Sequence, residues 1–171
     1  MEQIGNAKAF FEVFPTLKVE ESIQRLFADV KVRKITTNAT RDFLHVYIFS
    51  RHVIQKKVIW QMEQKIKEQL FATVMVNIRL EEQYVLSEQY TPEELMSEYR
   101  DSIMLELKQY SVLAASMFEH ARITFEEKNI CCLELIDTIV SEGKREYIVE
   151  LLNDIFHKRF GIPVEIRVAY R

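Results

Sequence analysis

The sequence is poor in the residues that punctuate loops, since its 171 residues include only three glycines and three prolines. This composition excludes a low-complexity linker and predicts few sharp turns. No apolar run approaches the roughly 18 residues that span a bilayer, and the N-terminal residues lack the basic start and apolar core of a secretory signal. We therefore expect a cytoplasmic protein, in which hydrophobic residues at 48% of the chain supply a core.

Residue types that hold metals or perform covalent catalysis are few and scattered. Only five aspartates occur, and none forms the Asp-x-Asp pair that would help to hold two metal ions about 3.5–4 Å apart. The four histidines are not spaced as metal ligands. Cys131 and Cys132 are adjacent in an expected strand and would point to opposite faces. The sequence thus predicts no catalytic residue, no metal site and no cofactor.

Charge is distributed unevenly along the chain. Residues 1–80 carry 13 Lys and Arg against 8 Asp and Glu, whereas residues 81–171 carry 10 against 18. The two halves therefore have net charges of +5 and −8. Segments of opposite sign are not expected to share one polyanionic partner.

The first half of the chain has the pattern of a small α/β unit. Two short helices are expected within residues 7–27, separated at Pro15. Alternating and then continuous apolar residues predict strands over Lys31–Ile35 and Phe43–Phe49. The stretch Val53–Leu80 is typical of a helix that runs directly into a strand.

The second half repeats this order. Thr91, Pro92 and Glu94 form a helix-start signal, because threonine caps the first turn, proline occupies the first helical position and glutamate completes a capping box. A second short helix and two strands follow. Tyr147–Phe160 then predicts a helix that Gly161 ends, and residues 164–170 predict the last strand.

We therefore predict an α+β protein of two tandem units, with a boundary between residues 82 and 83. Each unit should be a three-stranded sheet with helices on one face, in the order ααββαβ, which is one arrangement of a K-homology-like fold. The hairpin, crossover helix and final strand form the shared part of both units.

Basic residues of the first unit form a candidate interaction surface with one tryptophan. Its members are Lys31, Arg33, Lys34, Arg41, Arg51, Lys56, Lys57 and Trp60. These charges could protect an edge strand, bind an acidic protein or bind DNA. We favour a protein partner over DNA because the sequence predicts no exposed aromatic row beside them, which single-strand binding would require. The acidic second unit lacks a Gly-x-x-Gly loop and is not expected to bind nucleic acid.

The whole chain resembles the N-terminal region of the PolC-type DNA polymerase III alpha subunit, the replicative polymerase of low-GC Gram-positive bacteria. The segments that carry the resemblance are the start MEQ, Lys8–Phe14, Val30–Ile35, Arg41–Ser50, Leu86–Arg100 and Phe160–Pro163. The resemblance implies a first domain, residues 1–82, similar to the C-terminal domain of the clamp-loader tau subunit and to the N-terminal domain of the initiator DnaA. It implies a second domain, residues 83–171, similar to K-homology folds.

The same resemblance implies a function. The segment would be a noncatalytic docking module of the replisome, with the tau subunit or another replisome protein as partner. The alternative is a nucleic-acid-binding module that uses the basic first domain. In that family the full-length protein is a DNA-directed DNA polymerase with a 3'-5' exonuclease, and this chain would be a fragment of it.

Overall fold

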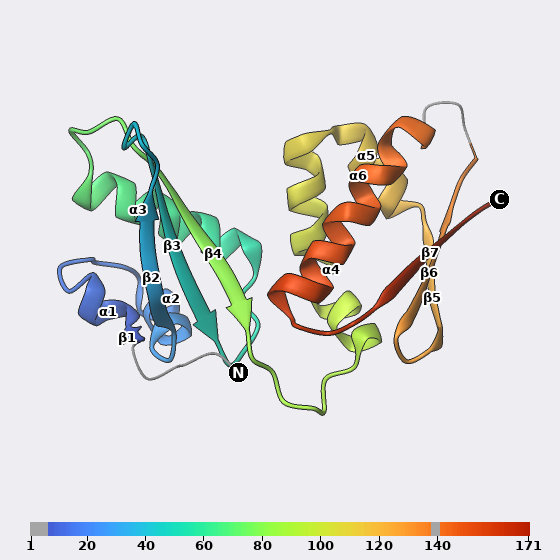
Figure 1. The fold of residues 1–171 in the computed structure, drawn as a ribbon, viewed down its shortest axis with the longest axis horizontal. Coiled ribbons are helices and arrows are strands. Elements are labelled where there is room, and N and C mark those ends of the chain that lie inside the picture. The colour runs from blue at the N-terminus through green and yellow to red at the C-terminus, as the bar shows by residue number, and fades with distance from the viewer. Residues whose placement is uncertain (1–6, 138–140) are drawn as a thin grey trace. The chain divides into compact units, whose positions relative to one another are not determined.

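A computed structural model describes residues 7–137 and 141–171, and the chain divides into two compact units, Met1–Leu86 and Ser87–Arg171 (Figure 1). We call these unit 1 and unit 2. Each contains its own sheet and its own helices, so the architecture is α+β, as predicted. The expected boundary after residue 82 falls inside the last strand of unit 1, which ends at Tyr84.

Unit 1 contains a four-stranded sheet of order β1-β2-β3-β4. Strands β2 and β3 form an antiparallel hairpin, and β4 returns parallel to β3 after the crossover helix α3. Figure 1 shows α3 lying across one face of this sheet. The elements are β1 (Lys8–Ala9), α1 (Phe10–Val13), α2 (Glu21–Phe27), β2 (Lys31–Thr37), β3 (Phe43–Ser50), α3 (Lys56–Leu70) and β4 (Asn77–Tyr84).

The prediction of three strands is wrong for unit 1, because β1 adds a fourth. This strand has only two residues and pairs antiparallel with the start of β2. A two-residue strand is too short for an alternating pattern to be recognised in the sequence. It brings the start of α1 close to the sheet, where the Phe10 N–H donates to the Val30 carbonyl at 2.9 Å.

The core of unit 1 consists of aromatic rings beneath the short helices and an aliphatic face of α3. Phe10 and Phe27 are fully buried, with their ring centroids 4.9 Å apart. On α3, Ile59, Met62 and Ile66 are fully buried and follow the three- to four-residue spacing of one helix face. This face packs on the sheet and fixes how α3 crosses it.

Unit 2 contains a three-stranded sheet of order β5-β6-β7, with β5 antiparallel and β7 parallel to β6. Helices α4, α5 and α6 lie on one side of it (Figure 1). The elements are α4 (Pro92–Tyr110), α5 (Val112–Glu119), β5 (Arg122–Glu127), β6 (Ile130–Leu135), α6 (Ser141–Asn153), the wider helical segment η2 (Asp154–Arg159) and β7 (Glu165–Tyr170).

The ends of the unit 2 helices follow the predicted signals. The Thr91 hydroxyl accepts the Glu94 N–H at 3.2 Å, which confirms the predicted cap of α4. Gly161 has a φ of 63°, a conformation that costs glycine little and ends the last helix. That helix begins at Ser141, six residues before the predicted start. None of the helices that the structure describes is long and apolar enough to span a bilayer.

Candidate interaction surface

The face of the unit 1 sheet opposite α3, which we call the outer face, carries three of the predicted basic residues, Lys31, Arg33 and Lys34. The β2–β3 register shifts between Val32 and Lys34, so Arg33 is the extra residue of a bulge. The Arg33 guanidinium donates to the Gln83 Oε1 on β4 at 2.6 Å and therefore reaches across β3. The Lys34 ammonium lies 4.6 Å from the centre of the Tyr47 ring.

Three rings of β3 form a column along the same face. The centroids of Phe43 and His45 are 4.6 Å apart, and those of His45 and Tyr47 are 6.3 Å apart, with ring planes inclined by 24° and 23°. All three side chains are half-buried. This column lies beside the basic residues, but because its rings are half-buried it is not the exposed aromatic row whose absence we predicted. The near-continuous apolar character of this strand concealed that every second residue faces outward.

An acidic residue completes the outer face on β4. The Glu81 Oε1 lies 3.1 Å from the His45 Nδ1 and 3.2 Å from the Arg79 Nε. Glu81 offsets one positive charge among Lys31, Arg33, Lys34 and Arg79, and the outer face stays basic. The sequence-based surface did not include Arg79, although its position in the strand pattern opposite His45 could have identified it.

The remaining predicted residues do not join this face as one patch. Arg41 lies in the β2–β3 turn with a φ of 56°, whereas Arg51 follows the other end of β3. Lys57 is exposed on the first turn of α3, and Trp60, one turn further along, is half-buried. Basic residues that are close together in the sequence therefore do not all lie close together in the structure.

Lys56 lies inside the protein and does not belong to the predicted surface. Its exposed fraction is 4%, and its ammonium donates to the Glu82 carboxylate at 2.9 and 3.2 Å. Burial of a lone ammonium would be costly, so a paired carboxylate is needed there. No local pattern indicates this pair, because its partners are 26 residues apart in the sequence.

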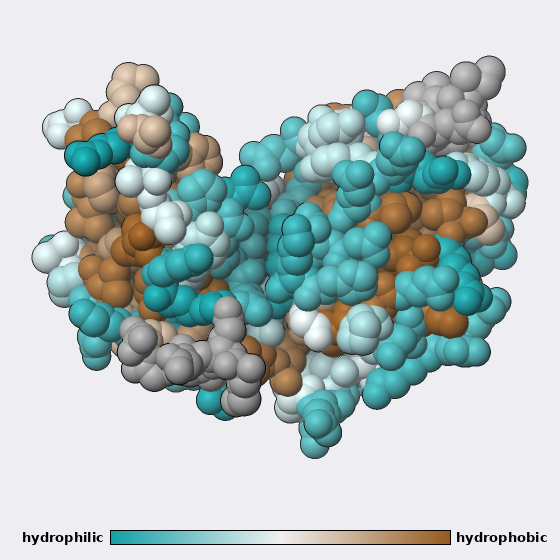
Figure 2. All heavy atoms as spheres, in the orientation of Figure 1, coloured by the Kyte–Doolittle hydropathy of each residue, from teal (hydrophilic) through white to brown (hydrophobic). Residues whose placement is uncertain are grey.

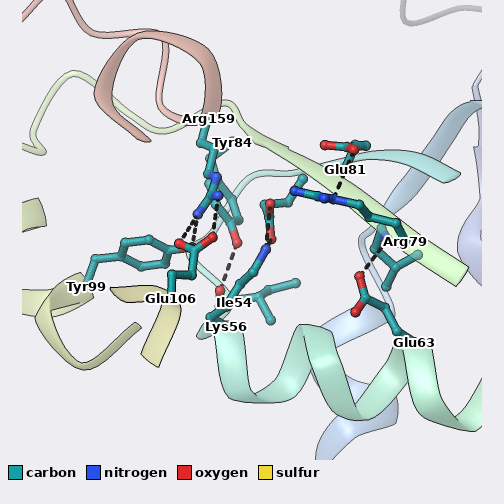
Figure 3. Close-up of polar contacts among 11 residues, drawn as sticks. Ile54, Lys56, Glu63, Arg79, Glu81, Tyr84, Tyr99, Glu106 and Arg159 are labelled. Atoms are coloured by element: carbon teal, nitrogen blue, oxygen red, sulfur yellow. Dashed lines mark hydrogen bonds and ion pairs between the residues drawn. The ribbon is translucent and has the colours of Figure 1, made fainter. Parts of the chain in front are cut away.

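Other side chains of α3 and its preceding loop also meet β4. The Glu63 Oε2 accepts the Leu80 N–H at 2.8 Å, and the Tyr84 hydroxyl donates to the Ile54 carbonyl at 2.8 Å (Figure 3). Desolvation of Glu63 raises its pKa, partly opposed by the hydrogen bond from Leu80. These contacts hold the crossover helix against the last strand.

In unit 2 a second charged cluster ties η2 to α4. The Arg159 guanidinium makes a bidentate contact with the Glu106 carboxylate at 2.6 and 2.7 Å and donates to the Tyr99 hydroxyl at 3.2 Å (Figure 3). Bidentate geometry of this kind is strong and directional. We interpret the cluster as structural, since both charges are largely buried.

The side chains with reactive chemistry have structural surroundings. Cys131 is buried, and desolvation raises the pKa of its thiol to about 12, so the reactive thiolate is disfavoured. The His52 Nε2 lies 3.0 Å from the Leu26 carbonyl, and the His157 Nε2 lies 2.9 Å from the Val164 carbonyl. Within residues 7–137 and 141–171, no three His, Cys, Asp or Glu side chains are grouped so that they could hold a metal ion.

Comparison with protein families gives one match, which covers most of unit 1. Residues 9–80 match the family described as DNA polymerase III polC-type N-terminus I. Searches of curated proteins and of solved structures found no match. The matched range runs from β1 to the middle of β4, and it includes the outer-face residues of β2 and β3 and Arg79 but not Glu81 or Gln83. Through residues 9–80, which are 72 of its 171 residues, the chain is therefore similar to the N-terminal region of PolC-type DNA polymerase III.

Proposed function

We propose that the chain is a noncatalytic docking region of a replicative polymerase, and that unit 1 binds the clamp-loader tau subunit through its outer face. The observation that carries the proposal is the combination of basic side chains and a half-buried aromatic column within the matched family segment. Aromatic residues and arginine are enriched at protein interfaces, where they bury area at a low entropic cost. The partner surface should be acidic, because Arg33, Lys34 and Arg79 flank the column.

The ring geometry favours a protein over a nucleic acid as the partner. Base stacking needs a free ring face. In the column, Phe43, His45 and Tyr47 turn faces toward one another, and the Lys34 ammonium lies over Tyr47. The ring edges remain available, and these suit apolar side chains of a protein better than flat bases.

Calorimetry with purified tau subunit tests the docking proposal. The chain should bind with a dissociation constant of tens of micromolar or tighter, and the double variant R33E/K34E should bind at least about tenfold more weakly. The matched control K108E/K128E makes the same charge change at exposed residues of unit 2 and should bind as the wild type does. Absence of heat and of co-elution at tens of micromolar, or equal losses in both variants, would contradict the proposal.

Nucleic-acid binding by unit 1 is the second candidate, favoured by the basic side chains of Lys31, Arg33, Lys34 and Arg79 on the outer face. Anisotropy with a labelled oligothymidylate distinguishes it from docking. If unit 1 binds the strand through phosphates, affinity should fall steeply with salt, with a slope near −0.7 for each neutralised phosphate of a single strand. Binding without salt dependence, or none at low salt, would rule this candidate out.

We extend the proposal to three broader points. Both units are K-homology-like variants, supported by the hairpin, crossover helix and parallel final strand that each contains. Unit 1 is similar to the tau C-terminal and DnaA N-terminal domains. The parent protein is a cytoplasmic DNA-directed DNA polymerase with 3'-5' exonuclease activity. An experimental structure of the parent protein, together with primer-extension and exonuclease assays, would test these points.

A further inference from the structure

The last strand of unit 2 leaves one backbone edge open. β7 is the terminal strand of its sheet and pairs with β6. The Glu165 N–H donates to the Asn129 carbonyl at 2.8 Å and the Arg171 N–H donates to the Leu135 carbonyl at 3.0 Å, so these residues bond toward β6. Because a parallel strand alternates sides at every residue, the amide and carbonyl groups of Ile166, Val168 and Tyr170 point to the open edge.

The corresponding edge of unit 1 is closed by side chains. The open-edge amide of Leu80 on β4 donates to the Glu63 carboxylate at 2.8 Å, and Glu82, two residues on, pairs with the buried Lys56. The sequence around Leu80, Val-x-Ile-Arg-Leu, matches Val-x-Ile-Arg-Val around Val168. The two strands are thus comparable, and Val168 takes the place of Leu80. Edges protected in this way do not accept a further strand.

In unit 2 the corresponding strand edge borders a groove and, among the described residues, is not covered by side chains as it is in unit 1. In the part of the chain that the structure describes, no side chain donates to or accepts from the open edge of Val168. The space between α6 and β7 is a groove of ≈ 360 Å³. Its lining residues are Arg145, Glu146, Val149, Glu150 and Val168. Figure 2 shows hydrophobic atoms at the surface along this part of unit 2.

The groove combines backbone hydrogen-bonding groups with an apolar floor and a wall in which two glutamates outnumber Arg145, whose guanidinium donates to the Tyr170 hydroxyl at 3.3 Å. Val168 shares the inner sheet face with its buried neighbour Leu133. Glu146 and Glu150 are exposed and lie one turn apart on α6. Unit 2 as a whole carries 10 Lys and Arg against 16 Asp and Glu, a net charge of −6.

We propose that the α6–β7 groove binds an extended, lysine-rich peptide segment that adds to β7 as a fourth strand. The backbone of the segment would pair with Ile166 and Val168, as in other cases of strand addition. Side chains alternate along a strand, so lysines at every second position would enter the groove and the residues between them would face the other side of the sheet. The methylene stem of each lysine would pack on Val149 and Val168, and its ammonium would reach Glu146 or Glu150. The proposal concerns unit 2 and does not depend on docking by unit 1.

Fluorescence anisotropy of the full chain with the labelled peptide KVKVKVK tests this site. We expect saturable binding to the wild type and at least about tenfold weaker binding of the charge-reversed peptide EVEVEVE. The variant E146K/E150K should reverse that preference. The control E126K/E127K makes the same charge change at exposed residues of the β5–β6 hairpin and should keep the wild-type preference. Equal effects of both variants would show nonspecific attraction and overturn the proposal.

A backbone variant tests strand addition itself. Val168→Pro removes an edge amide that points away from β6, a position at which an edge strand tolerates proline. It should weaken peptide binding about tenfold, because one backbone hydrogen bond is lost and the ring obstructs pairing. If circular dichroism shows that the Val168→Pro variant is misfolded, the variant Val149→Trp is used instead. Its indole ring fills the groove and should abolish peptide binding.

Unchanged affinity in a folded variant would overturn the proposal. A second copy of the chain is the other possible occupant of an open edge. Sedimentation that gives a dimer in the wild type and a monomer in Val168→Pro would also overturn it.

Discussion

The buried pair of Lys56 and Glu82 is the residue-scale feature with the largest expected effect on stability. Lys56→Met leaves the Glu82 carboxylate buried without its ammonium, and breaking a buried pair in this way typically costs about 3–5 kcal/mol. The only tryptophan, Trp60, lies on α3 and reports the unfolding of unit 1. Its fluorescence in urea should give a free energy of unfolding lowered by about 3 kcal/mol.

Two further variants separate the loss of the pair from the loss of a lysine. Exposed Lys57 should tolerate Met within about 0.5 kcal/mol. The double variant K56M/E82L removes both charges and should recover most of the lost stability, since apolar replacements of buried pairs are often neutral. A double variant as unstable as Lys56→Met would mean that the pair is not the cause.

Glu63 gives unit 1 a pH dependence of defined sign. Its pKa is raised by desolvation, so the folded unit binds this proton more tightly than the unfolded chain does. Its contribution to stability is therefore lost as pH rises from about 4.3, the value of an exposed glutamate, through the raised pKa.

The variant Glu63→Gln keeps an acceptor for the Leu80 N–H and removes the titration. The difference in unfolding free energy between the variant and the wild type should grow across this pH window and then level off. The same substitution at exposed Glu68 is the control. A pH-independent difference for Glu63→Gln would contradict the assignment.

At the scale of elements, the cap of α4 makes a separate prediction for unit 2. Thr91→Ala removes the acceptor of the Glu94 N–H and should lower stability by about 1 kcal/mol. Hydrogen exchange of α4 amides should accelerate, whereas the Trp60 transition of unit 1 should not change. Thr91→Ser should restore protection. Ser97→Ala in the exposed middle of α4 should not weaken it, because alanine has the higher helix propensity.

Elements with several local signals were predictable from the sequence. The α4 cap has three adjacent residues that agree, and the β2–β3 hairpin has two apolar strands around an Asn-containing turn. Elements without local signals were not. β1 is too short to show a period, and η2 continues the apolar spacing of α6 although its backbone is wider. The start of α3 at Lys56 is three residues later than expected and has no side-chain cap at Gln55 that would mark it in the sequence.

The candidate surface was predictable in charge but not in arrangement. Arg33 and Lys34 lie on one face, because a bulge interrupts the strand alternation between them. Lys56 is buried. Arg41 and Arg51 lie at opposite ends of β3. The bulge between Val32 and Lys34 decides which basic residues share a face. One extra residue in a strand reverses the face to which the following side chains point. A bulge of this kind has no signature in the sequence here.

At the scale of the whole molecule, opposite charges predict that the two units bind different partners. Unit 1 carries 13 Lys and Arg against 10 Asp and Glu, a net charge of +3, whereas that of unit 2 is −6. Each unit has its own sheet and its own buried residues, so we expect fragments 1–86 and 87–171 to unfold cooperatively when prepared separately. Circular dichroism during urea titration of each fragment measures this.

Folded fragments would then assign the two proposed activities. Fragment 1–86 should retain binding to the tau subunit, because the outer face lies wholly within it, and fragment 87–171 should retain binding to KVKVKVK, because α6 and β7 do. Loss of one activity alone would contradict only the corresponding proposal. Binding of both ligands by the acidic fragment would contradict the charge argument itself, since an acidic surface should repel the acidic partner expected for the outer face.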